Sequence, residues 1–248
     1  MMKSGIFIFI WKIKMNILAI DSSSNALSVA LETDTQIMYK EINSENSHSE
    51  LLMECADSLC KSAGIKPADL SLVACMKGPG SFTGLRIGFS AGKGIALALG
   101  IPLIAVPTLD CLAYSSLTQA ELVLPVLDAK KGCFFAAFYR KNERLTDFLD
   151  ANPLELFKIA SKILLQPEEP LILTGSGAEL LLSRLKETYP EALLPIKNIN
   201  LDKEFARGRA RELLKIIKKN KLCNENDIHG FPVYLRKSDA ELNCKKDG

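Results

Sequence analysis

The stretch GPGSFTGLRIG, residues 78–88, follows a short apolar run at 72–76 that is typical of a buried strand, and it leads into a long run of helix-forming residues. A glycine-rich turn between a strand and a helix often binds a phosphate at the helix N-terminus. No Lys-Ser or Lys-Thr pair ends this turn, so it is not a P-loop. We favour the alternative interpretation, in which the glycines shape a contact surface.

The helix predicted at 85–99 carries a column of small residues. Four of them, including the last residue of the turn, stand four positions apart: Gly84, Gly88, Gly92 and Ala96. Because a glycine within a helix costs up to about 1 kcal/mol relative to alanine, this column predicts that another backbone approaches the helix closely.

The composition places the chain among soluble globular proteins, with 248 residues, 48% of them hydrophobic, and a formal net charge of +2. This charge does not indicate a nucleic acid or a membrane as partner. The seven cysteines include no C-x-x-C pair, and the two histidines, His48 and His229, lie far apart in the sequence. We therefore predict no zinc site, and reduced thiols in a cytoplasmic protein.

Residues 1–14 contain an apolar run that Lys12 and Lys14 close. The run is too short to span a bilayer, and no small-residue cleavage site follows it. We expect this segment to be a mis-assigned start or an extension, with Met15 beginning the folded part.

Apolar periodicity and turn residues predict the order of the elements. Three strands at 16–20, 27–31 and 36–42 are expected to form an antiparallel meander. A capping box at residues 47–50 begins a helix that Gly64 ends. The other predicted elements are strands at 72–76, 102–106, 122–127, 133–139 and 171–174, and helices at 85–99, 109–116, 154–164, 178–189 and 205–219.

Five motifs occur in order along the chain: MNILAIDSSS, HSELL, GPGSFTGLRIG, LDAKKG and PVYLRKSDAE. With them the chain resembles the bacterial TsaB (YeaZ) family over residues 15–241. The resemblance implies an α/β fold of the actin-like, sugar-kinase-like (ribonuclease H-like) type with two related lobes, expected here at 15–115 and 116–248. It also implies a non-catalytic partner of TsaD, the enzyme that forms threonylcarbamoyladenosine next to the anticodon of transfer RNA, with the ATPase TsaE as a third component.

In nucleotide-binding relatives of this fold, the first strand is followed by an acidic residue, a glycine and a hydroxyl residue that contact phosphate. Here the turn is Asp21-Ser22-Ser23, with Ser22 in the glycine position, and glycine is what permits close approach of a phosphate. We therefore expect weak or no nucleotide binding and no cofactor; the alternative is a turn held by local hydrogen bonds. Residues that could keep vestigial nucleotide or phosphate contacts are Asp21, Ser22, Ser23, Gly80, Ser81, Thr83, Gly175 and Gly177.

The resemblance also distinguishes this chain from TsaD, which holds its metal with two histidines four residues apart. Thr108 and Leu112 stand at those positions here. Neither side chain can replace a histidine as ligand of a transition metal, so we predict neither a metal nor catalytic residues. A basic stretch near the C-terminus is interpreted either as a weak contact to transfer RNA or as a solvated face; it contains Arg207, Arg209, Arg211, Lys215, Lys218, Lys219 and Lys221.

The resemblance implies that the helices at 49–63 and 85–99 bind TsaD. In a competing arrangement, which the resemblance also implies, the same helices bind a second copy of the chain. The expected interface residues are Leu51, Leu52, Cys55, Ala56, Leu59, Gly88, Gly92 and Ile95. A bulky residue at Gly92 is then expected to block TsaD binding and to leave the fold intact.

Two alternatives stay open. The first is an ATP-dependent small-molecule kinase of the same superfamily, with Asp21 and Asp128 as metal-binding or basic carboxylates; the missing turn glycine argues against it. The second is a self-associating scaffold that makes no contact with TsaD.

Overall fold

The computed structural model describes residues 15–43, 48–117, 121–141, 143–202, 207–220, 222 and 225–236. The predictions for residues 1–14, for the start of the capping box, for Lys221 and for the last motif beyond Arg236 lie outside the described residues. Among the described residues, no helix combines the length and the apolar character needed to cross a bilayer.

The first sheet has the strand order β3-β2-β1-β4-β5. β1 (Ile17–Asp21), β2 (Ala26–Glu32) and β3 (Ile37–Asn43) are antiparallel neighbours, which confirms the predicted meander. β4 (Leu72–Met76) runs parallel to β1, and β5 (Leu103–Val106) runs parallel to β4. β1, β2 and β4 are buried along their whole length, as expected for strands covered on both faces.

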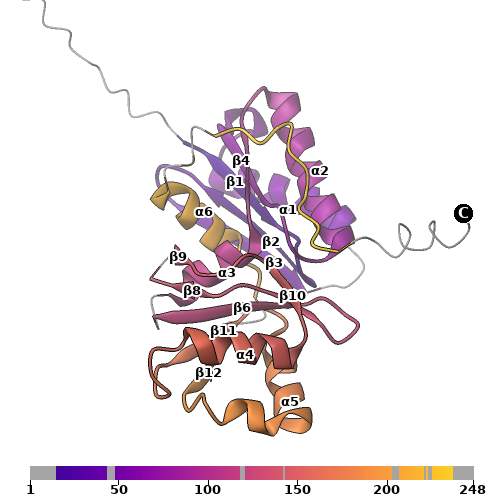
Figure 1. Ribbon diagram of the computed structural model, residues 1–248. Coiled ribbons are helices and arrows are strands. Elements are labelled where there is room, and N and C mark those ends of the chain that lie inside the picture. The colour runs from indigo at the N-terminus through magenta and orange to yellow at the C-terminus, as the bar shows by residue number, and fades with distance from the viewer. Residues whose placement is uncertain are drawn as a thin grey trace, which may run out of the picture.

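Helices cover both faces of this sheet (Figure 1). α1 (His48–Ala63) and α2 (Phe82–Leu99) pack on one face, and α6 (Ala210–Lys219) packs on the other. The pleat of the strands explains this division, because successive side chains point to opposite faces. In β4, for example, Val73 belongs to the core under α1 and α2, and its neighbour Leu72 belongs to the core under α6.

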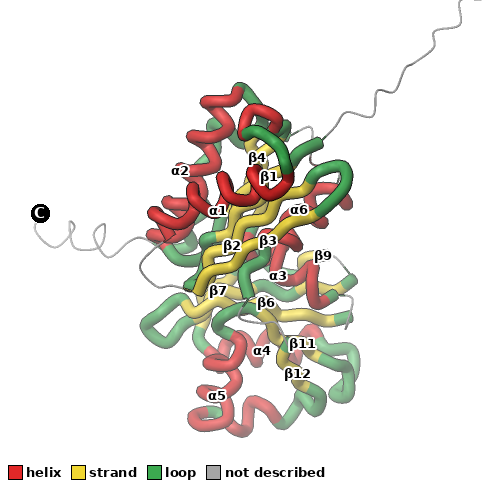
Figure 2. The backbone as a smooth tube through the Cα atoms, turned by 180° about the vertical axis from the view of Figure 1, so that it is seen from behind, coloured by secondary structure: helices red, strands yellow, loops and turns green. Residues whose placement is uncertain are grey.

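The second sheet, which lies below the first in Figure 2, repeats its topology. Its main path, β10-β7-β6-β11-β12, has antiparallel neighbours first and two parallel strands last, as β3-β2-β1-β4-β5 has. β8 and β9 branch off beside β6. The strands are β6 (Leu122–Asp128), β7 (Phe134–Ala136), β8 (Tyr139–Arg140), β9 (Glu143–Arg144), β10 (Leu149–Ala151), β11 (Leu171–Thr174) and β12 (Ile199–Leu201).

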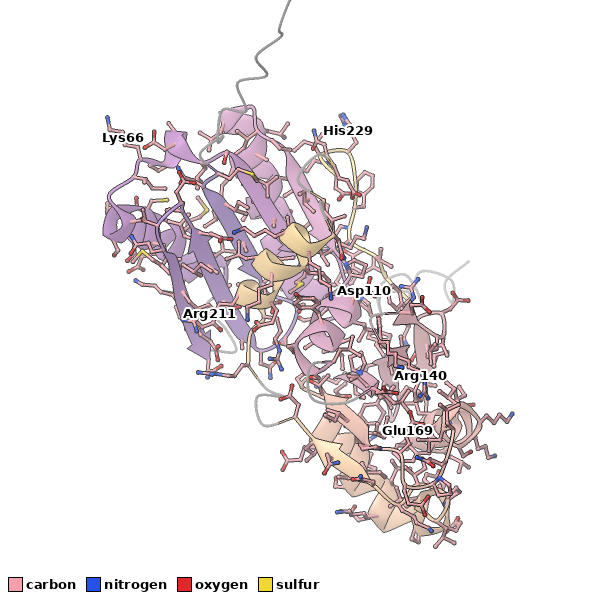
Figure 3. The ribbon with its side chains drawn as sticks, turned by 90° about the vertical axis from the view of Figure 1, so that its left-hand side faces the viewer. Lys66, Asp110, Arg140, Glu169, Arg211 and His229 are labelled. Atoms are coloured by element: carbon pink, nitrogen blue, oxygen red, sulfur yellow. The ribbon has the colours of Figure 1, made fainter. Side chains whose placement is uncertain are left out.

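Two helices, α4 (Pro153–Ile163) and α5 (Ala178–Thr188), share one core with the second sheet. The side chains of Arg140 and Glu169 point toward each other in this lobe (Figure 3) and form an ion pair that is largely buried. Short 3-10 helices lie at Pro67–Asp69 and Pro190–Leu193.

The third helix of each lobe packs against the sheet of the other lobe. α3 (Thr108–Ser116) follows β5 but contacts β6 and β11, and α6 follows β12 but contacts β1, β2 and β4. The two helices also contact each other. The boundary near residue 115 stays a prediction, but α6 packs on the first sheet, so not all of 116–248 lies with the second sheet.

The predicted glycine stops are present: Gly64 follows α1, and Gly100 caps α2 with a φ of 66°. α6 begins at Ala210, with Arg209 as its N-cap residue; residues 205 and 206 of the predicted helix lie outside the described part of the chain. The five cysteines among the described residues are free thiols, and four of them are buried. Burial raises the pKa of Cys75 and of Cys111, so these two thiols are expected to be unreactive.

Candidate functional site in the cleft between the lobes

A cleft of about 500 Å³ lies where loops of the two lobes meet, and this volume is typical of small-molecule sites. Its walls come from the β1–β2 turn, the loop before α2, the β6–β7 turn, the loop after β11 and the segment 233–236. Its polar and charged lining residues are Ser23, Ser24, Asn25, Ser81, Asp128, Lys130, Lys131, Ser176, Tyr234 and Arg236.

Asp21 is buried at the end of β1 and is not among the residues that line the cleft. Its Oδ1 accepts hydrogen bonds from the backbone N–H of Ser23 at 2.9 Å and from the Ser23 hydroxyl at 2.6 Å. Its Oδ2 accepts a hydrogen bond from the backbone N–H of Arg209 at 2.8 Å. This arrangement favours the turn held by local hydrogen bonds, and it also ties β1 to the start of α6.

Ser22, in the position of the missing glycine, points toward α2. Its hydroxyl donates a hydrogen bond to the carbonyl oxygen of Gly84 at 2.8 Å. The approach is so close that a Cβ on Gly84 would lie 2.0 Å from the Ser22 carbonyl oxygen. A backbone does approach the small-residue column, as predicted, but it is the β1–β2 turn of the same chain.

The glycine-rich loop before α2 is held by the same turn. The backbone N–H of Ser81 donates to the carbonyl oxygen of Ser23 at 2.8 Å, and Gly80 packs against that carbonyl. The Ser81 hydroxyl caps α2 by accepting from the Gly84 N–H at 3.2 Å, and Thr83 is exposed. Two of the N–H groups that an anion could use, those of Ser81 and Gly84, are therefore bonded within the chain, which favours a contact surface over a phosphate site.

The Gly175-Ser176-Gly177 turn wraps around the end of β6. The Gly177 N–H donates to the carbonyl oxygen of Val126 at 3.0 Å, and a Cβ on Gly175 would lie 2.5 Å from the same oxygen. These two glycines serve a strand-to-helix turn, and Ser176 is the residue of this turn that lines the cleft.

The β6–β7 turn gives the cleft a cationic side. Lys130 and Lys131 have φ of 59° and 53°, a left-handed conformation that is uncommon for residues other than glycine. Asp128 stabilises the turn, since its carboxylate accepts from the Lys130 N–H at 2.8 Å and pairs with the Lys130 ammonium at 3.0 Å. Arg236 also lines the cleft, so the cations among the lining residues outnumber the single lining carboxylate of Asp128.

The two positions expected from the resemblance to correspond to the metal ligands of TsaD are inside the protein. Thr108 and Leu112 are both buried, and Leu112 belongs to a core with the second sheet. Within the described part of the chain, no three His, Cys, Asp or Glu side chains gather in a way that could hold a metal ion.

A buried polar cluster, which no local pattern in the sequence predicts, joins the lobes. The Asp202 carboxylate accepts from the hydroxyls of Ser116 and Thr174, both at 2.8 Å, and lies 3.3 Å from the guanidinium of Arg209. Both charged side chains are 3% exposed. The prediction that Arg209 belongs to a solvent-facing basic stretch is therefore wrong, because its side chain pairs with Asp202.

Most of the expected interface residues face the core of the first lobe, which does not favour an intermolecular contact through these side chains; their role in an interface stays a prediction. Six of the eight are buried: Leu52, Cys55, Ala56, Leu59, Gly88 and Gly92.

Gly92 fits against the sheet, where a Cβ would lie 3.3 Å from Leu103 and 3.4 Å from Val73. A bulky residue there is therefore expected to disturb the fold, contrary to the prediction from sequence. Leu51 and Ile95 are half-buried. The large apolar side chains that α1 and α2 do expose are Met53 and Leu97, at 51% and 63%.

The basic stretch makes contacts within the chain. Arg211 extends from α6 (Figure 3) and lies over the ring of Tyr39, 4.4 Å from its centroid. Lys218 pairs with Glu32, and Lys219 lies over the ring of Tyr114. These contacts favour a solvated face, and a contact to transfer RNA stays a prediction.

The duplicated sheet topology and the cleft between the lobes define a protein of the actin-like fold. Two solved structures from Pseudomonas aeruginosa share this fold. One is described as an uncharacterized protein with similarity to peptidase YEAZ; the TM-score is 0.71 at 24% identity, covering 90% of this chain and all of that chain. The other, YeaZ, has a TM-score of 0.71 at 23% identity, covering 89% of this chain and all of that chain.

Sequence comparisons define the family. A model described as TsaD, tRNA N6-adenosine threonylcarbamoyltransferase, matches residues 40–244. The tRNA threonylcarbamoyladenosine biosynthesis protein TsaB of Bacillus subtilis is 29% identical over 92% of this chain and 96% of its own length. The Escherichia coli protein of the same name is 34% identical over 52% of this chain and 57% of its own. This chain belongs to the TsaB family.

Proposed function

We propose that this chain is a non-catalytic subunit in the formation of N6-threonylcarbamoyladenosine on transfer RNA, and that it binds a TsaD enzyme through the outer faces of α1 and α2. The names of its relatives support the pathway. The observation that carries the binding site is the exposure of Met53 and Leu97 on these two helices, which lie side by side in the first lobe (Figure 1).

The proposed surface differs from the one expected from sequence. The inner faces of α1 and α2 pack against the sheet, so the contact with TsaD uses residues on their outer faces. These residues are the half-buried Leu51 and Ile95 and the exposed Met53 and Leu97. Gly94 adds space on this outer face, because nothing lies within 4 Å of its Cβ position. A specific interface should bury at least about 1,000 Å² in total.

In this role the chain holds TsaD in a productive state and supplies no general base and no metal. TsaE joins the pair and supports turnover, and in the absence of TsaD the same face binds a second copy of this chain. Removing the chain should lower turnover by TsaD in a transfer RNA modification assay. Equal turnover by TsaD from the same source on its own would contradict the proposal.

The interface proposal predicts that Leu97→Asp, alone or with Met53→Asp, weakens TsaD binding at least about tenfold, because a charge in the centre of an apolar contact remains without a partner. The thermal midpoint should barely move, since surface substitutions usually change the free energy of unfolding by less than about 0.5 kcal/mol. Affinity can be measured by calorimetry or by co-purification of the tagged pair.

Leu165→Asp is the matched control, because Leu165 is also strongly exposed, at 79%, but lies after α4 in the second lobe. It should bind TsaD as the parent does. Equal loss of binding in both variants, or normal binding by the Leu97 variant, would exclude the α1–α2 face. Size measurements with and without TsaD separate this proposal from a scaffold that only self-associates.

The kinase alternative is not favoured by the geometry. Both carboxylate oxygens of Asp21 accept hydrogen bonds from within the chain, and Asp128 pairs with Lys130. Calorimetric titration with magnesium-ATP provides the test: binding in the micromolar range would favour the kinase, and very weak or no binding would favour the non-catalytic subunit.

A further inference from the structure

The last described segment, residues 225–236, connects three parts of the molecule. It follows α6 in the sequence, bonds to the edge strand β5, runs along α2 and ends at the second lobe (Figure 1, yellow). It has no helix or strand of its own. Its position is therefore determined by the contacts that it makes with other elements.

The first contact covers the edge of the first sheet. The N–H of Asp227 donates to the carbonyl oxygen of Leu103 at 2.6 Å. The Asp227 carboxylate accepts from the N–H of Ala105 at 2.9 Å, and the Asn226 side chain accepts from the N–H of Leu103 at 3.3 Å. Because β5 is an edge strand, these bonds satisfy groups that would otherwise be open to pairing with another chain.

The second contact lies at the glycine-rich loop. The Val233 N–H donates to the carbonyl oxygen of Lys77 at 2.5 Å. Gly78 has a φ of 98°, and a Cβ there would lie 2.5 Å from the Val233 carbonyl oxygen, so this position requires glycine. Next along the segment, Tyr234 packs on Phe82 with 4.8 Å between ring centroids, and its hydroxyl accepts from Arg86 Nε at 3.2 Å.

The third contact is with the second lobe. The Arg236 guanidinium binds both oxygens of Asp150, at 2.8 and 2.5 Å, and donates to the carbonyl oxygen of Ala129 at 2.8 Å. Leu235 packs against the core that contains Phe135. Asp150 belongs to β10 and Ala129 to the β6–β7 turn, so Arg236 fastens the segment to the wall of the cleft opposite α2.

We propose that residues 225–236 form a strap that sets the separation of the two lobes, with the Arg236–Asp150 pair as its releasable end. The contacts before Val233 are all with the first lobe. The pair is about one-quarter exposed on each side, at 26% and 24%, so water can compete for it. This inference goes beyond the proposed function and does not depend on it.

The strap also connects the cleft to α2. Two cations of α2, Arg86 and Lys93, lie against strap aromatic rings: Arg86 against Tyr234, and Lys93 over Phe231 at 5.2 Å. Val233, Tyr234, Leu235 and Arg236 line the cleft. Release of Arg236 therefore opens one wall of the cleft and loosens contacts on the outer flank of α2.

Amide hydrogen exchange of the full chain, followed by mass spectrometry, tests the strap. Arg236→Asp should speed exchange about fivefold both in the peptide that contains Val233 and in the β6–β7 turn at 128–132, because loss of a bidentate pair favours local opening. Asp150→Arg should have the same effect. The exchanged pair, Arg236→Asp with Asp150→Arg, should return exchange to within about twofold of the parent.

Lys197→Gln is the control, because it breaks an exposed pair with Glu168 that lies entirely within the second lobe. It should leave exchange in the strap unchanged. Asp150→Asn is a milder variant that removes the charge and keeps the shape, should Arg236→Asp not fold. Parental exchange in Arg236→Asp or in Asp150→Arg, or no recovery in the exchanged pair, would overturn the strap.

Discussion

Replacing Asp202 with alanine should lower the free energy of unfolding by about 3–5 kcal/mol, because it leaves the Arg209 guanidinium buried without its carboxylate. Both side chains are 3% exposed, and the hydroxyls of Ser116 and Thr174 lose their acceptor as well. The cluster joins α3 and β11 to the start of α6. The variant should therefore unfold in one transition at lower denaturant, which circular dichroism can follow.

Two comparisons isolate the cause. Asp57→Ala removes an aspartate from an exposed pair with Lys61, and such pairs contribute little to stability, so this variant should unfold much as the parent does. The double variant Asp202→Ala with Arg209→Met should be less damaging than the sum of the single changes, since the charge that loses its ion-pair partner in each single variant is then absent as well. Strict additivity would mean that the two side chains do not stabilise each other.

Local signals in the sequence were enough for most of the fold. The meander of β1, β2 and β3 follows from short apolar segments between turn residues, and α2 from its run of helix formers ended by Gly100. β11 lies where its apolar run predicts it. In each case the deciding information, which is periodicity or a capping residue, lies within a few positions of the element itself.

Features that depend on distant contacts were not predictable. β10 and β12 have three residues each, which is too short for a periodic pattern, and they exist because a neighbouring strand pairs with them. The crossing of α3 and α6 to the opposite sheet has no local signal. Arg209 sits among other basic residues, and only the fold reveals that its partner is Asp202.

In the candidate site, too, the local turns were predictable from the sequence and the distant contacts were not. The sequence identified the turns at Asp21, at Gly78 and at Gly175, and the structure brings these turns together around one cleft. The sequence could not reveal that the Asp21 carboxylate accepts hydrogen bonds from Ser23 and Arg209. Nor could it reveal that the segment ending at Arg236 closes one wall, because a segment without helix or strand leaves no periodic pattern.

Gly84 is the first member of the small-residue column on α2, and its substitution is expected to cause a large loss of stability. Gly84→Ala should destabilise the protein by about 3 kcal/mol or more and lower its thermal midpoint by roughly 6–12 °C, because overpacking against a rigid backbone is costly. The added Cβ would lie 2.0 Å from the Ser22 carbonyl oxygen. That oxygen cannot move without disturbing the end of β1, where Ser22 also bonds to α2 through its hydroxyl.

Gly94→Ala provides the control on the same helix. Nothing lies within 4 Å of a Cβ at Gly94, so alanine there should stabilise the protein by up to about 1 kcal/mol through helix propensity alone. The two substitutions are chemically identical, ten positions apart on α2, and are expected to have effects of opposite sign. If calorimetry gave the same shift for both, the column would not be an internal contact, and an intermolecular role for its glycines would be favoured again.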